Sequence, residues 1–270
     1  MNSPNPAKPA STVLFIRDGE RGLEVYLIRR VKQMAFAGGM TAYPGGGVDE
    51  RDLDADFGWI GPDPGFWADA FGADERMARA LVAAAVRETF EEAGILLATD
   101  GQTPVQDTDT DEWEAERLAL LDRKQSLAEM LHKRGLSLRA DLIRPWAHWI
   151  TPEQEPKRYD TRFFLMKLPD GVHPRAISTE HDKAEWVPVA QAIEESDSGA
   201  RPMLPPTTAT LTDLAQFSTA DEAMAGAPPR RLEPIQPELV EVEGTSYVKL
   251  PDGTLIKPSF RIGPGRSVAD

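Results

Sequence analysis

The sequence predicts an α/β protein, because segments with the patterns of strands and of helices follow one another along its 270 residues. Residues 11–17 and 23–30 are rich in apolar and β-branched side chains on either side of an Asp-Gly pair, which is typical of a β-hairpin. An alanine-rich stretch predicts a helix that begins near Asp74, a good N-cap, and ends at Gly94 in a left-handed turn.

The remaining chain divides into a main domain at 11–217 and two flanking segments. Further strands are predicted at 143–150 and 159–168, one or two amphipathic helices over 113–134, and helices at 189–196 and 208–217. Residues 1–10 hold three prolines and are expected to be disordered. Residues 218–270 form a proline-rich C-terminal extension, in which 247–256 predict a β-hairpin around a Pro-Asp-Gly turn.

Composition narrows the functional class. The formal net charge of −14 and the pI near 4.8 argue against a broad nucleic-acid or anionic-membrane surface, which would need clusters of Lys and Arg. The absence of cysteine excludes disulfides, thiolate metal sites and a cysteine nucleophile. With no run of 18 apolar residues and no apolar leader, we expect a soluble, cytoplasmic protein.

The end of the alanine-rich helix carries a cluster of carboxylates. At about 100° per residue, Glu88, Glu91 and Glu92 fall on one exposed arc, and the apolar residues of the segment fall on the opposite side. Like charges at these spacings weaken a helix, so a cation is expected to compensate them. Ligands that are all oxygen suit Mg²⁺ or Mn²⁺. The alternative is a solvated acidic face without a ligand.

A glycine loop lies upstream, at residues 43–49 (Tyr-Pro-Gly-Gly-Gly-Val-Asp). This loop and the segment Arg87–Ile95 together resemble the two halves of the Nudix hydrolase box. The helical half fits position by position except at Thr89, where the family usually has an aliphatic residue. Gly46 lies 41 positions before Arg87, so the box is split by an insertion at about residues 50–73. Such a split resembles the Nudix subfamily that includes the peroxisomal coenzyme A diphosphatases.

The resemblance implies a Nudix-type α/β/α sandwich with a mixed sheet, and hydrolysis of a diphosphate with Mg²⁺ or Mn²⁺. It implies that Glu88, Glu91, Glu92 and the carbonyl of Gly45 are metal ligands, and that Arg87 orients a carboxylate of the box. Glu180 matches a Glu that in many Nudix proteins precedes a Trp-containing strand and acts as base or extra ligand. Its rivals are Glu153, Glu155, His181, Asp182 and, as an alternative catalyst, His148.

The expected partner is a small-molecule nucleoside diphosphate derivative, and the resemblance favours coenzyme A or an acyl-CoA. Arg29, Arg30, Lys32 and Arg162 are the candidate cations for its phosphates, although Arg29 and Arg30 should point to opposite faces of a strand. Three alternatives remain open: an ADP-ribose or NADH diphosphatase, a non-catalytic nucleotide-binding module, and an RNA-decapping enzyme.

The insertion is unusually aromatic, with Trp59, Phe66, Trp67 and Phe71 among Gly, Pro and Asp residues. A solvated loop gains nothing from so many aromatic rings, so we expect them to be packed. The packing surface is either the protein itself, where the insertion would act as a lid, or a partner protomer in a homodimer.

Overall fold

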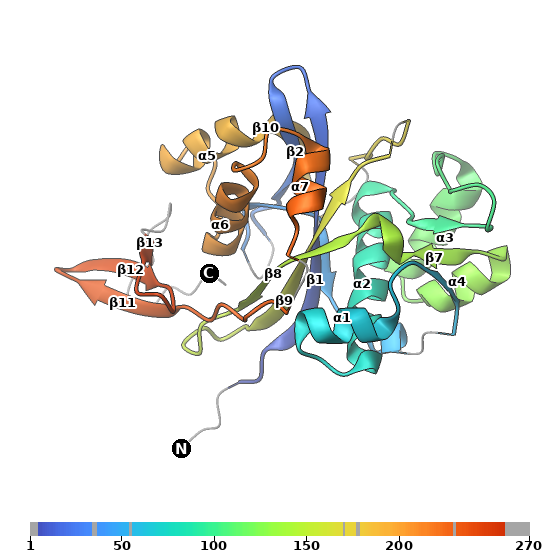
Figure 1. Cartoon of the computed structure of the whole chain (residues 1–270), viewed down its shortest axis with the longest axis horizontal. Coiled ribbons are helices and arrows are strands. Elements are labelled where there is room, and N and C mark those ends of the chain that lie inside the picture. The colour runs from blue at the N-terminus through green and yellow to red at the C-terminus, as the bar shows by residue number, and fades with distance from the viewer. Residues whose placement is uncertain are drawn as a thin grey trace.

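The computed structural model describes residues 5–33, 37–53, 56–169, 171–176, 179–228 and 231–256. A seven-stranded mixed sheet lies between two groups of helices, which makes the predicted α/β/α sandwich (Figure 1). Its strands are β1 (Lys8–Gly19), β2 (Gly22–Arg30), β3 (Thr41–Ala42), β4 (Gly45–Gly47), β8 (Arg144–Ile150), β9 (Tyr159–Lys167) and β10 (His181–Pro188). The main order is β10-β2-β1-β9-β8, while β3 pairs with β2 and β4 pairs with β1.

The central strand β1 is apolar on both faces because helices cover both sides of the sheet. Val13 and Phe15 belong to one hydrophobic core, while Leu14 and Ile16 belong to the other, and all four are fully buried. The first core includes side chains of α1 (Pro64–Phe71), α2 (Glu75–Ala93), α3 (Asp111–Leu121) and α4 (Leu127–Arg134). The second includes side chains of α5 (Val189–Asp197), α6 (Pro205–Leu214) and α7 (Ala220–Gly226).

The predicted hairpin is present, and Ile16 to Gly19 of β1 pair with Gly22 to Val25 of β2. The disorder expected for residues 1–10 is wrong for the part that pairs with the sheet. β1 begins at Lys8, because its first residues pair in parallel with β9, and Ala10 also pairs with Gly47 of β4. Residues 1–4 lie outside the described part of the chain.

The insertion is packed into the protein, as its aromatic residues predicted. It forms a 3₁₀ turn, η1 (Glu50–Leu53), the short strand β5 (Gly58–Ile60) and helix α1; residues 54 and 55 lie outside the described part. Trp67 and Phe71 of α1 are buried, and their rings lie 5.6 and 5.1 Å from the ring of Phe164 in β9. Trp59 and Phe66 are only partly buried.

Two smaller sheets flank the sandwich. β5 and β6 (Ala98–Thr99) pair with β7 (Ser137–Arg139), which is followed by the turn η2 (Ala140–Leu142). The C-terminal extension forms β11 (Glu238–Val242), β12 (Thr245–Lys249) and β13 (Leu255–Ile256); the predicted hairpin is the β12–β13 pair. The second core continues past the predicted boundary at Phe217, because Ala220 and Ala223 of α7 are buried in it.

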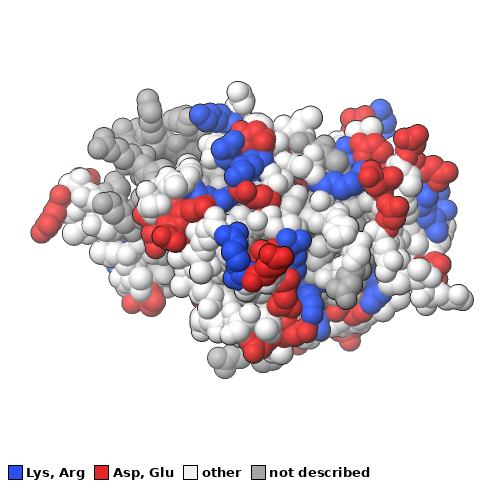
Figure 2. All heavy atoms as spheres, turned by 90° about the horizontal axis from the view of Figure 1, so that it is seen from above, with Lys and Arg blue, Asp and Glu red and all other residues white. Residues whose placement is uncertain are grey.

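The distribution of charge on the surface agrees with the expectation, from the composition, that there is no broad basic surface. On the face shown in Figure 2, basic and acidic side chains of the described residues alternate in small clusters, and neither sign covers a broad area. None of the helices in the described part of the chain combines the length and the apolar character needed to cross a bilayer.

We predict that Trp67→Ala lowers the free energy of unfolding by about 3 to 5 kcal/mol, because it removes a large, fully buried ring from the core. Urea titration measures the loss. Phe66→Ala, at the partly buried neighbouring position, is the matched control and should cost less than half as much. A loss below about 1 kcal/mol for Trp67→Ala would show that the insertion is not part of the cooperative core.

Candidate active site

Helix α2 presents the carboxylates of the predicted box. Asp74 caps its start by accepting a 2.8 Å hydrogen bond from the Met77 N–H, and Gly94 ends it with φ 67°, as predicted. The carboxylates are not on an exposed arc, because β4 and η1 cover this side of the helix. Glu91 and Glu92 are only 6% and 5% exposed.

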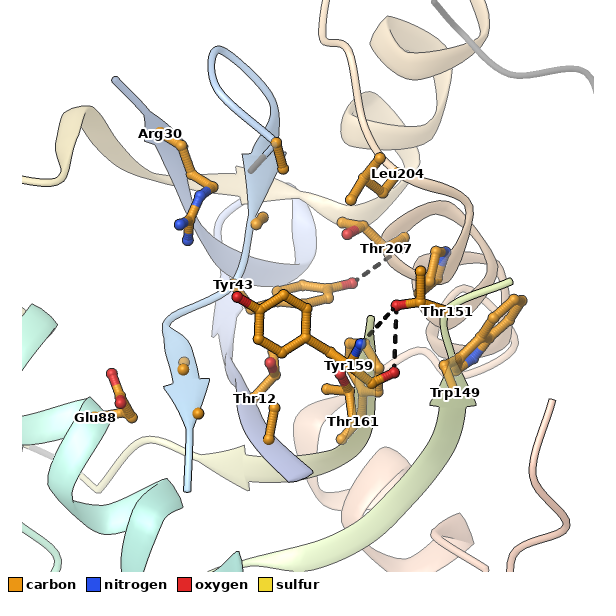
Figure 3. Close-up of a pocket in the computed structure, with 18 of the residues that line it drawn as sticks. Thr12, Arg30, Tyr43, Glu88, Trp149, Thr151, Tyr159, Thr161, Leu204 and Thr207 are labelled. Carbon is orange, nitrogen blue, oxygen red and sulfur yellow. Dashed lines mark hydrogen bonds between the residues drawn. The ribbon is translucent and has the colours of Figure 1, made fainter. Parts of the chain in front are cut away.

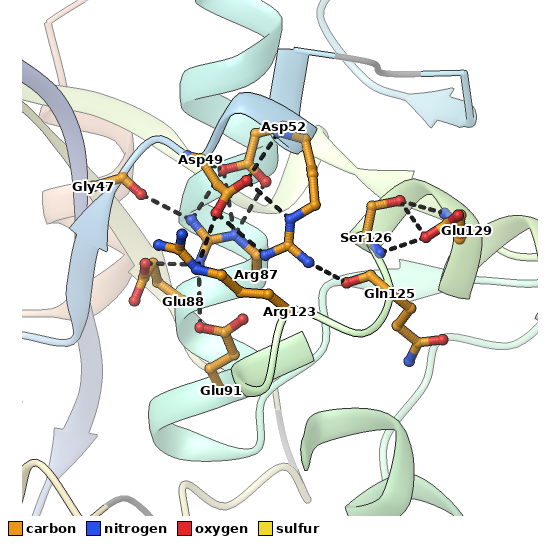
Figure 4. A network of polar contacts seen from close by, with 11 residues as sticks. Gly47, Asp49, Asp52, Arg87, Glu88, Glu91, Arg123, Gln125, Ser126 and Glu129 are labelled. Atoms are coloured by element: carbon orange, nitrogen blue, oxygen red, sulfur yellow. Dashed lines mark hydrogen bonds and ion pairs between the residues drawn. The ribbon is translucent and has the colours of Figure 1, made fainter. Parts of the chain in front are cut away.

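Arg87 connects the parts of the site (Figure 4). Its Nη2 donates to the Gly47 carbonyl at 2.8 Å and to Asp52 of η1 at 2.9 Å. Its Nη1 donates to Glu88 at 2.8 Å and to Glu91 at 3.1 Å. One buried guanidinium therefore joins the glycine strand, the insertion and two carboxylates of α2.

The glycine strand β4 packs between α2 and β1, and a side chain at Gly45 or Gly46 would collide with one of them. The Gly45 N–H donates to Glu92 Oε2 at 2.8 Å. A Cβ atom at Gly46 would lie 2.4 Å from Oε1 of Glu88, and one at Gly45 would lie 2.4 Å from the Ser11 carbonyl. At Gly45 the obstacle is the backbone of β1, which cannot give way, so glycine is required there for the N–H to reach Glu92.

Burial and mutual repulsion raise the pKa of every carboxyl in this cluster. Burial, and then the charge of Glu88, raises the pKa of Glu91 to about 7. Burial, Glu88 and Glu180 raise the pKa of Glu92 well above its ordinary value. The pKa of Glu88 is raised mainly by burial, which its bond to Arg87 only partly offsets.

The donor set fits a hard divalent cation. All its side-chain donors are carboxylate oxygens, and a cation would relieve the repulsion among them. Within the described residues, no three acidic or histidine side chains converge as a formed coordination sphere. Instead, Glu88 and Glu91 direct oxygens to Arg87, and Glu92 directs one to Gly45.

The carboxylates line one end of a pocket of about 520 Å³, which continues into a mainly apolar end (Figure 3). Tyr43, Trp149, Tyr159 and Phe163 form its aromatic part. The hydroxyl of Tyr43 contacts the Thr207 carbonyl at 3.2 Å. The other wall residues at this end include Ile150, Pro152, Leu204, Pro205, Pro206, Pro237, Leu239 and Val248.

Two of the other predicted residues line the same pocket. Glu180 lies close enough to Glu88 and Glu92 to raise the pKa of both, and its carbonyl accepts a 2.9 Å hydrogen bond from the Val31 N–H. Arg30 also lines the pocket, where its charge acts to lower the pKa of Glu92.

Arg29 and Arg162, which were predicted to bind substrate, lie outside the residues that line the pocket. Side chains alternate along a strand, so Arg29 points away from the face of Arg30 and pairs with Asp182 at 2.6 Å. Arg162 points away from the pocket-lining Thr161 for the same reason. It is buried against Asp160 and the Phe71 carbonyl, so it has no access to a ligand in this pocket.

Most of the alternative candidates for the base or extra metal ligand lie outside the pocket lining. His148 is buried outside the pocket lining and contacts Asp160 Oδ1 at 2.6 Å, which is a structural pairing. His181 contacts the backbone carbonyl of Glu92 at 3.3 Å. Of the remaining rivals, Glu155 lines the pocket, whereas Glu153 and Asp182 do not.

Sequence reasoning missed several residues that contact the site. Asp52 and Arg51 follow the glycine loop closely, and that proximity was the available signal. Arg123 lies in the turn after α3 and also lines the pocket, while Leu239 and Val248 come from the C-terminal extension. Only tertiary contacts bring these last three residues to the site.

Comparisons with known proteins agree with this geometry. A family model described as the NUDT19 Nudix domain matches residues 66–214. A solved NUDIX hydrolase from Alicyclobacillus acidocaldarius is 32% identical with a TM-score of 0.69, and the match covers 83% of this chain and 98% of that chain.

Two curated relatives bear the name acyl-coenzyme A diphosphatase NUDT19. The Xenopus laevis protein is 26% identical over 74% of this chain, and the Gallus gallus protein is 25% identical over 78% of it. The chain spans 61% and 66% of the lengths of these two relatives. The family match covers more than half of the chain, including α2 and Glu180: this chain belongs to the Nudix hydrolase family, and its matched region is of the NUDT19 type.

Proposed function

We propose that the chain hydrolyses the diphosphate of coenzyme A or an acyl-CoA with a divalent cation. The observation that carries the proposal is a single pocket with a carboxylate cluster at one end and a long apolar wall at the other. Coenzyme A has the matching parts, since its diphosphate separates a nucleotide from a long pantetheine arm. The names of the frog and chicken relatives support the same substrate class.

The apolar end suits a flexible arm better than a nucleobase. Four prolines line it, and proline has no backbone N–H with which to read the edge of a base. The Thr151 hydroxyl donates to the Tyr159 carbonyl at 3.3 Å, and the Tyr43 hydroxyl contacts Thr207. Aliphatic and aromatic surface therefore dominates the contact that a ligand would make there.

Glu88, Glu91 and Glu92 would hold the divalent cation, with the Gly45 carbonyl as a further ligand. When bound, Mg²⁺ or Mn²⁺ neutralises the charge of the diphosphate and lowers the pKa of water. Arg87 fixes Glu88 and Glu91 through its paired hydrogen bonds. Arg30 lies where it can contact a phosphate oxygen, because it lines the pocket near Glu92.

Glu180 is the residue that we assign as general base. Hydrolysis joins the oxygen of water to one phosphorus, and the bond from that phosphorus to the bridging oxygen breaks. The bridging oxygen leaves with the electron pair as part of the second phosphate, and Glu180 takes the proton of the attacking water. With coenzyme A, the products are 3',5'-ADP and 4'-phosphopantetheine.

A substrate panel tests this proposal. With Mg²⁺ or Mn²⁺, we expect coenzyme A and acyl-CoAs to be cleaved with a higher kcat/KM than NADH, ADP-ribose or capped RNA. Mass spectrometry of the products should show 3',5'-ADP, and excess EDTA should abolish turnover. Faster cleavage of ADP-ribose or NADH would move the assignment to those substrates, and binding without turnover would indicate a non-catalytic module.

Substitutions in the pocket should lower turnover without unfolding the protein. We expect Glu91→Gln to reduce kcat by at least about 100-fold, because a neutral amide is a poor ligand for a hard cation. Glu180→Gln should reduce kcat by about 100-fold or more, the usual contribution of a general base. Steady-state kinetics at saturating cation measures both effects.

His148→Gln is the control for these variants, since His148 is a buried residue outside the pocket lining. Its kcat, corrected for the folded fraction, should stay within about twofold of wild type. A large loss for this variant together with full activity of Glu180→Gln would reverse the assignment of the base.

The buried carboxylates should also destabilise the fold when no cation is bound. The pKa of Glu92 is raised in the folded state, so the folded protein binds more protons than the unfolded one above pH 4.5, and stability falls as pH rises. Gln cannot ionise, and its oxygen can still accept the Gly45 hydrogen bond. In EDTA, Glu92→Gln should therefore raise the Tm, and by more at pH 8 than at pH 5. An equal shift at both pH values would contradict this.

A further inference from the structure

The turn between α3 and α4 brings an arginine to the carboxylate end of the pocket. Arg123 lies two residues after the end of α3 and lines the pocket, and its side chain is 77% exposed. Its φ of 58° is in the left-handed region, which residues other than glycine rarely adopt. This conformation is fixed by a 2.9 Å hydrogen bond from the Arg123 N–H to the Leu120 carbonyl.

Arg123 adds positive charge to an ion pair that is already balanced. Arg51 donates to both oxygens of Asp49, at 2.9 and 3.2 Å, and its Nη1 donates to the Gln125 carbonyl at 2.6 Å. The hydrogen bond from Arg51 is the main reason that the pKa of Asp49 is lowered to about 2. Arg123 approaches Asp49 only to 3.5 Å, so these three side chains carry one positive charge in excess.

The positive charge of Arg123 lies at the carboxylate end of the pocket. Figure 4 shows Arg123 reaching from the α3–α4 turn over the network of Arg87 and Asp49. Arg51, Arg87 and Asp49 line the pocket together with the carboxylates of α2. The apolar wall described above is built from other elements, including β8 and the C-terminal strands. A substrate whose arm occupies that wall would direct its nucleotide toward Arg123.

We propose that Arg123, supported by Arg51, forms an anion subsite for a phosphate monoester of the substrate that is distinct from the scissile diphosphate. In coenzyme A this group is the 3'-phosphate, which lies on the same ribose as the diphosphate. The planar guanidinium of Arg123 can donate two parallel hydrogen bonds to phosphate oxygens. Arg51 is held by Asp49 and Gln125, so it contributes mainly its charge. The assignment of this phosphate rests on the proposed function.

Arg123→Gly tests the subsite, because glycine adopts a φ of 58° without strain and preserves the turn. For this variant we expect kcat/KM for coenzyme A to fall about 10-fold, mainly through KM, because the phosphate loses its charge-assisted contact with an exposed guanidinium. Dephospho-coenzyme A should change by less than about twofold. Arg123→Lys, which keeps the charge but not the planar fork, should lie between.

Lys124→Ala is the matched control. Lys124 is the next residue, is 72% exposed, pairs with Asp122 at 2.7 Å and does not line the pocket. Calorimetric titration with 3',5'-ADP and with 5'-AMP supplies a readout that is independent of turnover. Binding of 3',5'-ADP should weaken about 10-fold in Arg123→Gly, and binding of 5'-AMP should not change.

Equal losses for coenzyme A and dephospho-coenzyme A would overturn the proposal by placing Arg123 at the diphosphate. No loss in either assay would also overturn it and leave Arg123 as a surface residue. If the wild-type protein cleaves neither substrate, the proposed function fails, while the titration still decides whether the subsite exists.

Discussion

The site depends on one buried guanidinium. Arg87 is 6% exposed and bonds to the Gly47 carbonyl, Asp52, Glu88 and Glu91. Removing a charged group from water is costly unless every partner is in place, so this network is stable only as a complete unit. Because the Arg87 guanidinium needs all its partners, it holds the glycine strand, the turn η1 and helix α2 in one arrangement.

This network explains how the site tolerates an insertion between its two halves. In a contiguous box, a short connection would hold the glycine loop near the helix. Here β4 is instead fixed by pairing with residues 10–12 of β1, and η1 supplies Asp52 to Arg87 from within the insertion. Helix α1, later in the same insertion, packs Trp67 into the core. Tertiary contacts thus replace the constraint of chain connectivity.

Sequence signals between neighbouring residues predicted where helices and strands form. Which residues face the pocket depends on tertiary contacts, which the sequence does not show directly. Asp74 and Gly94 end α2 as the sequence indicates, because capping depends only on neighbouring residues. Strand alternation showed that Arg29 and Arg30 face opposite ways, but only the packed sheet identifies Arg30 as the one in the pocket. Arg162 was a wrong candidate, since the face of β9 that points to the pocket cannot be known before the helices are placed. The sequence predicted the C-terminal hairpin but carried no local signal that Leu239 and Val248 line the pocket.

The parallel pairing of β1 with β9 sets the order in which this protein can assemble. Lys8 to Ile16 pair with Tyr159 to Lys167, some 150 residues later in the chain. During synthesis, β1 can form its hairpin with β2 at once, but its other edge has no partner until β9 has left the ribosome. An apolar strand with an open edge is prone to intermolecular pairing. The edge of β1 that β9 covers in the folded protein is therefore open to pairing with other chains until residues 159–167 have been synthesised.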